Sequence, residues 1–366
     1  MAIYVKRVNK LRKIGRNAGI NAFLINSEKN MRYFAGFSVL SLERFAGIII
    51  PVENQTPILV VSRLEAEKAK EYSAFKDVRS YEDSENPAIL LKRIIKEQKL
   101  EEAIFGVEWT LPFKFYRMLN ECSPQIRVED ASNLFSQLRS VKSAEELEKI
   151  KRAASIVAKG IKTGIESIQP GVSELSISFE IEKTIKQSGG ESVPFCLVLS
   201  GSNSALPHGE TSNRKINKKD VVLMDVGAVY EGYYADLTRT IFIGEATKIQ
   251  RKIYETVLKA QEVAIKAVKP NIKAAQVDMT ARKIIEDSGY GRYFTHRTGH
   301  GLGLEVHEEP YITSGNKTVL RRGMTFTIEP GIYLPGKFGV RIEDDIAVSE
   351  TRGELLSNLC KEILII

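Results

Sequence analysis

The sequence predicts an α/β domain over residues 1–135, followed by a larger α+β domain over residues 136–366. Three observations support this prediction. The chain has 366 residues, which is longer than one ordinary core requires and suits two domains. Its first third alternates short apolar strands with helices, as α/β domains do. The remainder combines helices with a run of antiparallel strands, as α+β domains do.

Hydrophobic periodicity predicts the elements of the first domain. Short apolar runs broken by Pro and Gly predict buried strands, and spacing at helical intervals predicts amphipathic helices. The expected elements are an aromatic-rich strand entered by a turn over 30–37, buried strands over 45–52 and 57–61, helices over 63–72 and 87–98, and a strand over 103–107.

A capping signal marks the start of the second domain. Ser143 stands three residues before Glu146, which is the pattern of a capping box at a helix N-terminus. The helix that follows is expected to end before Pro170. Further expected elements are helices over 173–188, 250–268 and 273–288, strands over 221–228 and 233–243, and strands with glycine-rich loops from 294 onward.

Composition argues against several classes of protein. No run approaches the roughly 20 apolar residues of a membrane helix. The net charge of +7 comes from 53 basic residues interspersed with 46 acidic ones, and a nucleic-acid groove would need clustered basic residues. Three widely spaced cysteines form no disulfide framework, which suits a cytoplasmic protein. From the charge pattern and the lack of a long apolar run, we expect neither nucleic-acid nor membrane partners.

The four histidines of the chain form the first candidate site. They are His208, His296, His300 and His307, and three of them lie within a dozen residues. A single histidine is usually structural. All four lie in surroundings rich in glycine and acidic residues, and imidazole is the usual metal ligand and proton carrier near neutral pH. The group therefore indicates a functional site.

Two acids on neighbouring strands strengthen this interpretation. Asp225 interrupts an apolar strand, where an unpaired charge is costly. A hairpin centred on Tyr230 and Glu231 would place Asp236 directly opposite Asp225, about 5 Å away. Opposed carboxylates repel each other unless a positive charge lies near them. A metal ion would supply that charge, and the alternative is that Arg239 or a lysine does so.

Glu329 and Glu343 repeat the pattern of an acid on an apolar strand. With His300 and the two aspartates they form an oxygen-rich set containing one nitrogen. Such a set suits Mn²⁺, Co²⁺, Fe²⁺ or Zn²⁺ and argues against a thiolate site. Two ions about 3.5–4 Å apart would balance the charge, and their chemistry would be the hydrolysis of an amide or ester.

Six short motifs occur in order along the second domain: Pro207-His208-Gly209, Asp225-Val226-Gly227, Asp236-Leu237-Thr238-Arg239-Thr240, His296-Arg297-Thr298-Gly299-His300-Gly301, Glu329-Pro330-Gly331 and Arg341-Ile342-Glu343-Asp344-Asp345. Together they closely resemble the pita-bread metallopeptidases, which include methionine aminopeptidase, aminopeptidase P, prolidase and creatinase. The resemblance covers residue 136 to the end. The segment Tyr33-Phe34-Ala35-Gly36-Phe37 resembles the creatinase-type N-terminal domain of prolidases and aminopeptidases P.

The resemblance implies a metal role for five residues. Asp225 would chelate one ion, Asp236 and Glu343 would bridge both, and His300 and Glu329 would complete the other. Glu329 would also serve as the general base for the attacking water. The implied cofactors are two divalent ions, with Mn²⁺ or Co²⁺ expected before Zn²⁺ or Fe²⁺.

The resemblance implies roles for four further residues, three at the substrate and one, Arg341, in catalysis. His208 and His307 would contact the scissile carbonyl or the new amine. His296 would form the proline pocket or support it, as in the proline-specific branch. Arg341 would lie beside the bridging Glu343.

The expected activity is hydrolysis of the peptide bond before proline, in a homodimer. We favour an Xaa-Pro dipeptidase, because the compact chain resembles microbial prolidases. An Xaa-Pro aminopeptidase is the alternative, since Tyr311 follows His307-Glu308-Glu309-Pro310 where some relatives carry an arginine. In a dipeptidase, Arg297 or a residue from the N-terminal domain of a partner subunit would replace that arginine. A metal-free binding protein on the same fold is a distant alternative, because all five ligands are present.

Overall fold

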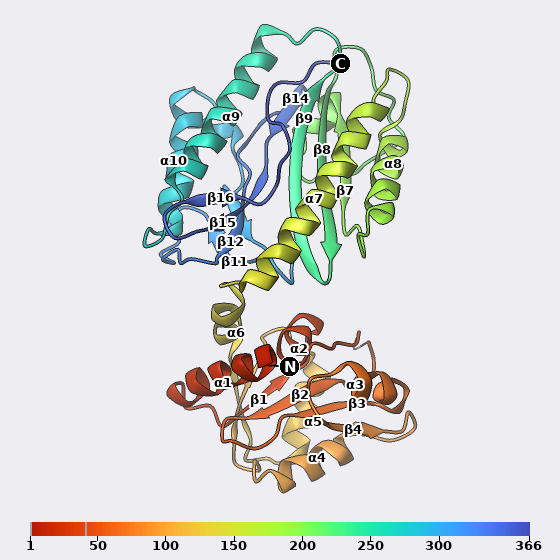
Figure 1. Cartoon of the computed structure of the whole chain (residues 1–366), viewed down its shortest axis with the longest axis vertical. Coiled ribbons are helices and arrows are strands. Elements are labelled where there is room, and N and C mark those ends of the chain that lie inside the picture. Colours follow the sequence, from red (N-terminus) through yellow and green to blue (C-terminus); the bar gives the residue numbers. More distant parts are fainter. Residues whose placement is uncertain (1, 41) are drawn as a thin grey trace. The chain divides into compact units, whose positions relative to one another are not determined.

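The structure is a computed structural model that describes every residue except Met1 and Ser41. The chain divides into two compact units, residues 1–139 and 140–366 (Figure 1). Each unit has its own sheets and its own buried core. In the described residues, no helix is long and apolar enough to cross a membrane.

The N-terminal unit is built on a six-stranded sheet in the order β4-β3-β2-β1-β5-β6. Strand β1 pairs antiparallel with β2 and parallel with β5, so the sheet is mixed. The expected α/β character of this unit is confirmed. Its elements are α1 (Ala2–Asn17), β1 (Ala22–Ile25), α2 (Glu28–Ala35), β2 (Gly47–Pro51), β3 (Ile58–Ser62), η1 (Arg63–Glu65), α3 (Ala66–Tyr72), β4 (Asp77–Tyr81), α4 (Pro87–Glu97), β5 (Ile104–Val107), α5 (Phe113–Cys122), β6 (Arg127–Asp130) and α6 (Ser132–Arg139).

The strand predicted over residues 30–37 is wrong, because the segment forms helix α2. Both ends of this helix are capped. Ser27 accepts a hydrogen bond from the backbone N–H of Asn30, and Gly36 closes the helix with a φ of 69°. The aromatic residues Tyr33 and Phe34 are buried in the unit's interior. Capping and burial therefore outweigh the β-propensity of the aromatic side chains.

The C-terminal unit contains a three-stranded sheet β7-β8-β9, a five-stranded sheet β11-β10-β12-β15-β16 and a two-stranded ribbon β13-β14. The predicted capping box of Ser143 and Glu146 is confirmed. The elements are α7 (Ala144–Ser167), α8 (Glu174–Gln187), β7 (Cys196–Ser200), η2 (Gly201–Ala205), β8 (Val221–Tyr230), β9 (Tyr233–Phe242), α9 (Lys248–Ala267), α10 (Ala274–Asp287), η3 (Gly291–Tyr293), β10 (Gly299–Gly301), β11 (Glu308–Ile312), β12 (Thr325–Ile328), β13 (Gly331–Leu334), β14 (Phe338–Arg341), β15 (Asp344–Val348) and β16 (Gly353–Leu355).

Two helix pairs, α7–α8 and α9–α10, repeat the same pattern within this unit (Figure 1). Helix α8 begins at Glu174 and α10 at Ala274, an offset of 100 residues. The turns before them also correspond, since Gly171 and Asn271 both have positive φ. The α7–α8 pair packs on β7–β9 over one hydrophobic core, and the α9–α10 pair packs on the later strands over another.

Candidate metal centre

All nine residues singled out from the sequence line one cavity of about 260 Å³ in the C-terminal unit. The structure therefore brings together residues from a span of more than 130 positions. The complete lining is Phe195, Leu197, Pro207, His208, Asp225, Asp236, His296, Arg297, His300, Val306, His307, Glu329, Arg341 and Glu343.

The β8–β9 hairpin positions the two aspartates. Its turn is Glu231–Gly232, both with positive φ, and Tyr230 pairs with Tyr233. The predicted direct opposition of Asp225 and Asp236 is therefore wrong: Asp225 lies opposite Thr238, and Asp236 lies opposite Gly227. A two-residue turn of this kind needs positive φ at both central positions, and glycine suits it better than tyrosine. The shift preserves the alternation of side chains, so both aspartates remain on one face.

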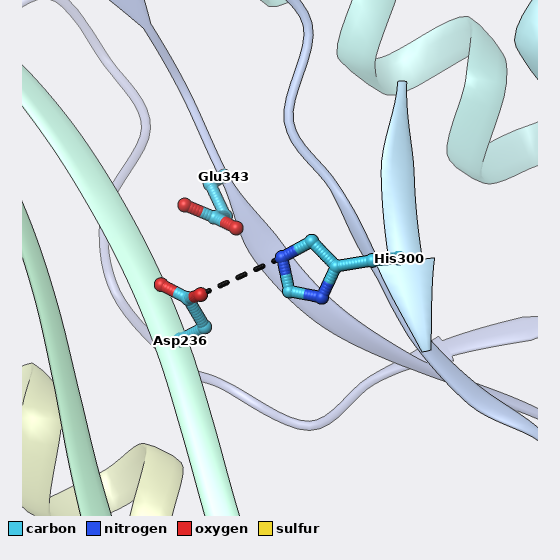
Figure 2. A group of neighbouring side chains, drawn as sticks. All are labelled: Asp236, His300 and Glu343. Atoms are coloured by element: carbon cyan, nitrogen blue, oxygen red, sulfur yellow. Dashed lines mark ion pairs between the residues drawn. The ribbon is translucent and has the colours of Figure 1, made fainter. Parts of the chain in front are cut away.

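Asp236, His300 and Glu343 converge from three different strand segments (Figure 2). One potential ligand atom from each lies within 4.8 Å of the others. His300 Nε2 is 3.7 Å from Asp236 Oδ2 and 3.3 Å from Glu329 Oε1. His300 Nδ1 lies 3.1 Å from the carbonyl oxygen of Gly301. A carbonyl can only accept a hydrogen bond, so Nδ1 carries the proton and the Nε2 lone pair faces the carboxylates.

Several carboxylate oxygens in and next to this cavity are buried without a hydrogen-bond partner. They are Asp225 Oδ1, Asp236 Oδ1, Glu343 Oε1 and Asp345 Oδ1. Buried polar atoms in native proteins almost always have partners, so these oxygens need an explanation. Oxygen atoms of carboxylates together with a neutral imidazole nitrogen are the donors that hard and borderline divalent cations prefer. The residues present therefore fit a metal centre.

The pKa values at the site agree with a need for positive charge. Burial, reinforced by neighbouring carboxylates, raises the pKa of Asp236 and Glu343 well above the usual range. Burial likewise raises the pKa of Glu329 to about 7. Burial and the nearby His307 lower the pKa of His300 to about 3, which keeps its imidazole neutral. A cation among these groups would stabilise the ionised carboxylates without protonating the histidine.

The alternative, in which Arg239 neutralises the carboxylates of Asp225 and Asp236, does not agree with the structure. The Arg239 guanidinium binds Asp344 at 2.8 Å and the carbonyl oxygen of Glu343 at 2.6 Å. It does not line the cavity. Arg341 instead pairs with Asp225 through its Nη2 atom. Of the described residues that line the cavity, none is a lysine.

Two threonines that the sequence reasoning missed hold the carboxylates in place. Thr238 Oγ1 donates a hydrogen bond to Glu343 Oε2 at 2.6 Å. Thr327 Oγ1 donates to Glu329 Oε1 at 3.0 Å and accepts from the backbone N–H of His300 at 3.1 Å. Thr327 lies two positions before Glu329, so strand periodicity could have placed them on one face.

Tyr333 is a third residue that the sequence reasoning missed. Its hydroxyl accepts a hydrogen bond from Arg341 Nη1 at 2.7 Å and lies 2.9 Å from His296 Nε2. His296 Nδ1 donates to the carbonyl oxygen of Arg297, so Nε2 is the acceptor for the tyrosine proton. Burial raises the pKa of Tyr333 to about 12 and lowers that of His296 to about 4, so both groups are neutral near pH 7.

His208 and His307 are the more exposed histidines of the cavity. The His307 ring lies edge-to-face against His300, with centroids 4.1 Å apart. Burial and the charge of Arg297 lower the pKa of His307, which favours its neutral form. The arrangement gives the cavity two accessible imidazoles beside the buried carboxylates.

Comparison with known proteins now decides the family. The model described as metallopeptidase family M24 matches residues 148–350, and that of the creatinase/prolidase N-terminal domain matches residues 7–141. The chain belongs to metallopeptidase family M24. The expected fold, an α+β pita-bread domain preceded by a creatinase-type domain, is confirmed.

Other M24 proteins resemble the chain along nearly its whole length. An Xaa-Pro dipeptidase from Pyrococcus furiosus is 38% identical over 98% of this chain and 99% of its own. The structure of a prolidase from Thermococcus sibiricus has a TM-score of 0.93 at 41% identity, covering 99% of each chain. An X-Pro aminopeptidase from Thermotoga maritima has a TM-score of 0.88 at 34% identity, covering 98% of this chain and 99% of its own.

Proposed function

We propose that this M24 protein is an Xaa-Pro dipeptidase that hydrolyses the peptide bond before proline. The observation that carries the proposal is the cavity itself, in which the five expected ligands lie together with unpaired buried oxygens. Relatives named prolidase or Xaa-Pro dipeptidase, 36–41% identical over nearly the whole chain, support the choice of substrate. A cavity of about 260 Å³ suits a small peptide.

Two divalent ions would be held by Asp225, Asp236, His300, Glu329 and Glu343, with Mn²⁺ or Co²⁺ proposed before Zn²⁺ or Fe²⁺. Bound there, they would polarise the scissile carbonyl and lower the pKa of the attacking water. Thr238 and Thr327 would keep Glu343 and Glu329 oriented toward them.

The protein's own groups would then move and hold protons. Glu329 is the proposed general base, because its carboxylate lies in the cavity and one of its oxygens is fixed by Thr327. His307, neutral near pH 7, would hydrogen-bond the scissile carbonyl or the new amine together with His208. His296 would support the proline pocket while Tyr333 fixes its ring.

An Xaa-Pro aminopeptidase is the second candidate, favoured by the relative from Thermotoga maritima with that name. Incubation of metal-stripped protein, with Mn²⁺ restored, with Met-Pro and with Met-Pro-Ala separates the two. We expect release of methionine chiefly from Met-Pro. Chief release from Met-Pro-Ala would favour the aminopeptidase, and cleavage of neither peptide would contradict both candidates.

We also propose a homodimer in the cytoplasm. Sedimentation equilibrium tests the first part, since the chain has a mass of 41.0 kDa and a dimer would have twice that. A species at the mass of one chain at micromolar concentration would contradict it.

A further inference from the structure

The loop that carries His208 is closed at its neck by one buried carboxylate. This His208 loop, residues 201–211, leaves strand β7 at Ser200 and returns at Ser212. Glu174, the first residue of α8, is fully buried and contacts both ends. Glu174 Oε1 accepts hydrogen bonds from the backbone N–H and the hydroxyl of Ser200 at 2.7 and 2.6 Å. Glu174 Oε2 accepts the corresponding pair from Ser212 at 3.0 and 2.7 Å.

Contacts of neighbouring residues reinforce the neck of the loop. The backbone N–H of Glu174 donates to the carbonyl oxygen of Arg214 at 3.0 Å, and that of Leu175 donates to the carbonyl oxygen of Ser212 at 3.1 Å. The Arg214 guanidinium also binds the Ser200 hydroxyl. The first turn of α8 therefore holds the returning segment through its backbone, and it reaches the outgoing end through the Glu174 carboxylate.

His208 depends on this loop for its place in the cavity that it lines. The residue is exposed, and among the residues that the structure describes none forms a hydrogen bond with its imidazole. The chain turns at this point, with the N–H of Gly209 donating to the carbonyl oxygen of Leu206 at 3.1 Å. Since no hydrogen bond from the described residues fixes the ring, the backbone of the His208 loop determines where the imidazole lies.

We propose that Glu174 is a positioning residue, which keeps His208 at the reacting bond by closing the neck of the His208 loop. This inference rests on the proposed function, in which His208 contacts the scissile carbonyl or the new amine. Glu174 is not among the residues that line the cavity, so it acts on the substrate through His208. A group displaced by about 1 Å from its productive position can lower the rate by roughly 100-fold.

Glu174→Gln opens the neck with little change in side-chain volume. The amide has a single acceptor oxygen, and its NH₂ group would face the donors of Ser200 or Ser212, so one end of the loop loses its partner. We expect kcat/KM for Met-Pro in the Mn²⁺-restored enzyme to fall by roughly 10- to 100-fold. Mn²⁺ affinity, measured by isothermal titration calorimetry, should stay at the wild-type value, because none of the five proposed ligands lies in the His208 loop. A loss of Mn²⁺ affinity as large as the loss of kcat/KM would place the effect at the metal centre and overturn the proposal.

A double-mutant cycle with His208→Ala separates positioning from a general structural role. If Glu174 acts through His208, its substitution has nothing left to displace once the imidazole is gone. The double variant should therefore hydrolyse Met-Pro no more slowly than His208→Ala alone. Losses that multiply in the double variant would overturn the proposal, as would a wild-type rate in either single variant.

Glu108 offers a matched control in the N-terminal unit. Its buried carboxylate likewise accepts from two backbone N–H groups, those of Asn26 at 2.8 Å and Ser27 at 3.1 Å, and from Asn30 Nδ2 at 2.7 Å. Glu108→Gln should lower the free energy of unfolding about as much as Glu174→Gln does, and keep the wild-type rate with Met-Pro. An equal loss of kcat/KM in Glu108→Gln would show that the rate follows stability alone, which would also overturn the proposal.

The outcomes separate this inference from the function beneath it. If the wild type cleaves no Met-Pro, the proposed function and this inference fall together. If the wild type cleaves Met-Pro but the losses multiply, the Glu174 assignment alone is overturned. Urea denaturation verifies that each variant is folded under the assay conditions. Should Glu174→Gln fail to fold, Ser212→Ala, which removes one donor to Glu174 Oε2, takes its place in the cycle: a loss that His208→Ala absorbs supports the assignment, and a multiplied or absent loss overturns it.

Discussion

At the scale of single residues, the site is defined by carboxylates that the protein buries without pairing. Asp236 is 5% exposed and Glu343 is 1% exposed, and each has one oxygen without a hydrogen-bond partner. Burying an ionised carboxylate is costly unless a cation compensates for the lost hydration. The free energy of unfolding of the metal-free protein should therefore be lowered by an amount that depends on the ionisation of these groups.

Glu329 allows this change to be measured. Its pKa in the folded protein is about 7 against a usual 4.5, so the folded state binds this proton more tightly than the unfolded state. The contribution of Glu329 to stability is thus present at low pH and is lost as the pH rises from about 4.5 through 7. In metal-free protein, Glu329→Gln should gain stability relative to wild type between pH 5 and pH 8, by roughly 2 kcal/mol.

Urea denaturation of both metal-free proteins at the two pH values gives this difference. The difference between variant and wild type isolates Glu329 from His296 and His300, whose lowered pKa values change stability in the opposite direction. A stability difference that is the same at pH 5 and pH 8 would show that the Glu329 carboxylate is not perturbed.

Tyr333 should matter for activity beyond its contribution to folding. Tyr333→Phe removes a hydroxyl that links His296 to Arg341, and leaves their nitrogens without that partner. We expect kcat/KM for Met-Pro to fall by about 10-fold or more, with a stability loss of roughly 1–3 kcal/mol. Tyr81→Phe removes another buried hydroxyl, which donates to the Phe45 carbonyl at 2.8 Å in the N-terminal unit.

The control should lose comparable stability and keep its activity. Steady-state kinetics and urea denaturation of both variants make the comparison. Equal activity losses in the two variants, or full activity in Tyr333→Phe, would contradict a positioning role for Tyr333.

All nine residues that the sequence singled out line the cavity, because their chemistry is carried by short ordered motifs. The sequence did not identify Tyr333, Thr238 or Thr327 as their supports. Thr238 and Tyr333 form hydrogen bonds with residues of other strand segments, and no spacing along the sequence predicts such a contact. Only the proximity of Thr327 to Glu329 in one strand segment was within reach of periodicity.

At the scale of secondary structure, helices with capping signals were predicted well and turn positions were not. The long helix after Ser143 follows its capping box as expected. The hairpin register was misplaced by two residues, because Tyr230, Glu231 and Gly232 offer adjacent positions for a two-residue turn. Helix α2 was predicted as a strand because its segment is rich in aromatic residues, which favour strands. In the structure, Tyr33 and Phe34 are buried on a helix. Tertiary contacts decide both cases.

Strand β10 shows how closely an element controls the site. A Cβ atom at Gly299 would lie 1.8 Å from the carbonyl oxygen of Thr327, a backbone atom that cannot move freely. Gly299→Ala should push the His300 strand away from its neighbour and destabilise the unit by several kcal/mol, as overpacking does. Gly315→Ala is the control, since a Cβ there meets nothing within 4 Å.

Thermal unfolding and Mn²⁺ binding of both glycine variants test this account. Gly315→Ala has a positive φ of 83° and should lose only about 1 kcal/mol. Gly299→Ala with wild-type stability and wild-type Mn²⁺ affinity would contradict the proposed link between β10 and the site.

At the scale of the whole molecule, the five proposed metal ligands come from both halves of the C-terminal unit. Asp225 and Asp236 come from the strands that follow the first helix pair, and His300, Glu329 and Glu343 come from those after the second. The correspondence of the two helix pairs was not predicted from the sequence, although Ile185 and Ile285 match at the same offset. Ions bound by all five ligands would therefore connect the two halves and stabilise the unit by mass action.

The most direct test of the central claim is a titration of metal-free protein with Mn²⁺ while the rate of Met-Pro hydrolysis is followed. We expect no hydrolysis without metal, and a rate that rises to a plateau at two equivalents per chain. Asp236→Asn should remove this dependence. A plateau at one equivalent would contradict the two-ion centre. Mn²⁺ binding without any cleavage of Met-Pro would contradict the assignment of proline dipeptides as the substrate.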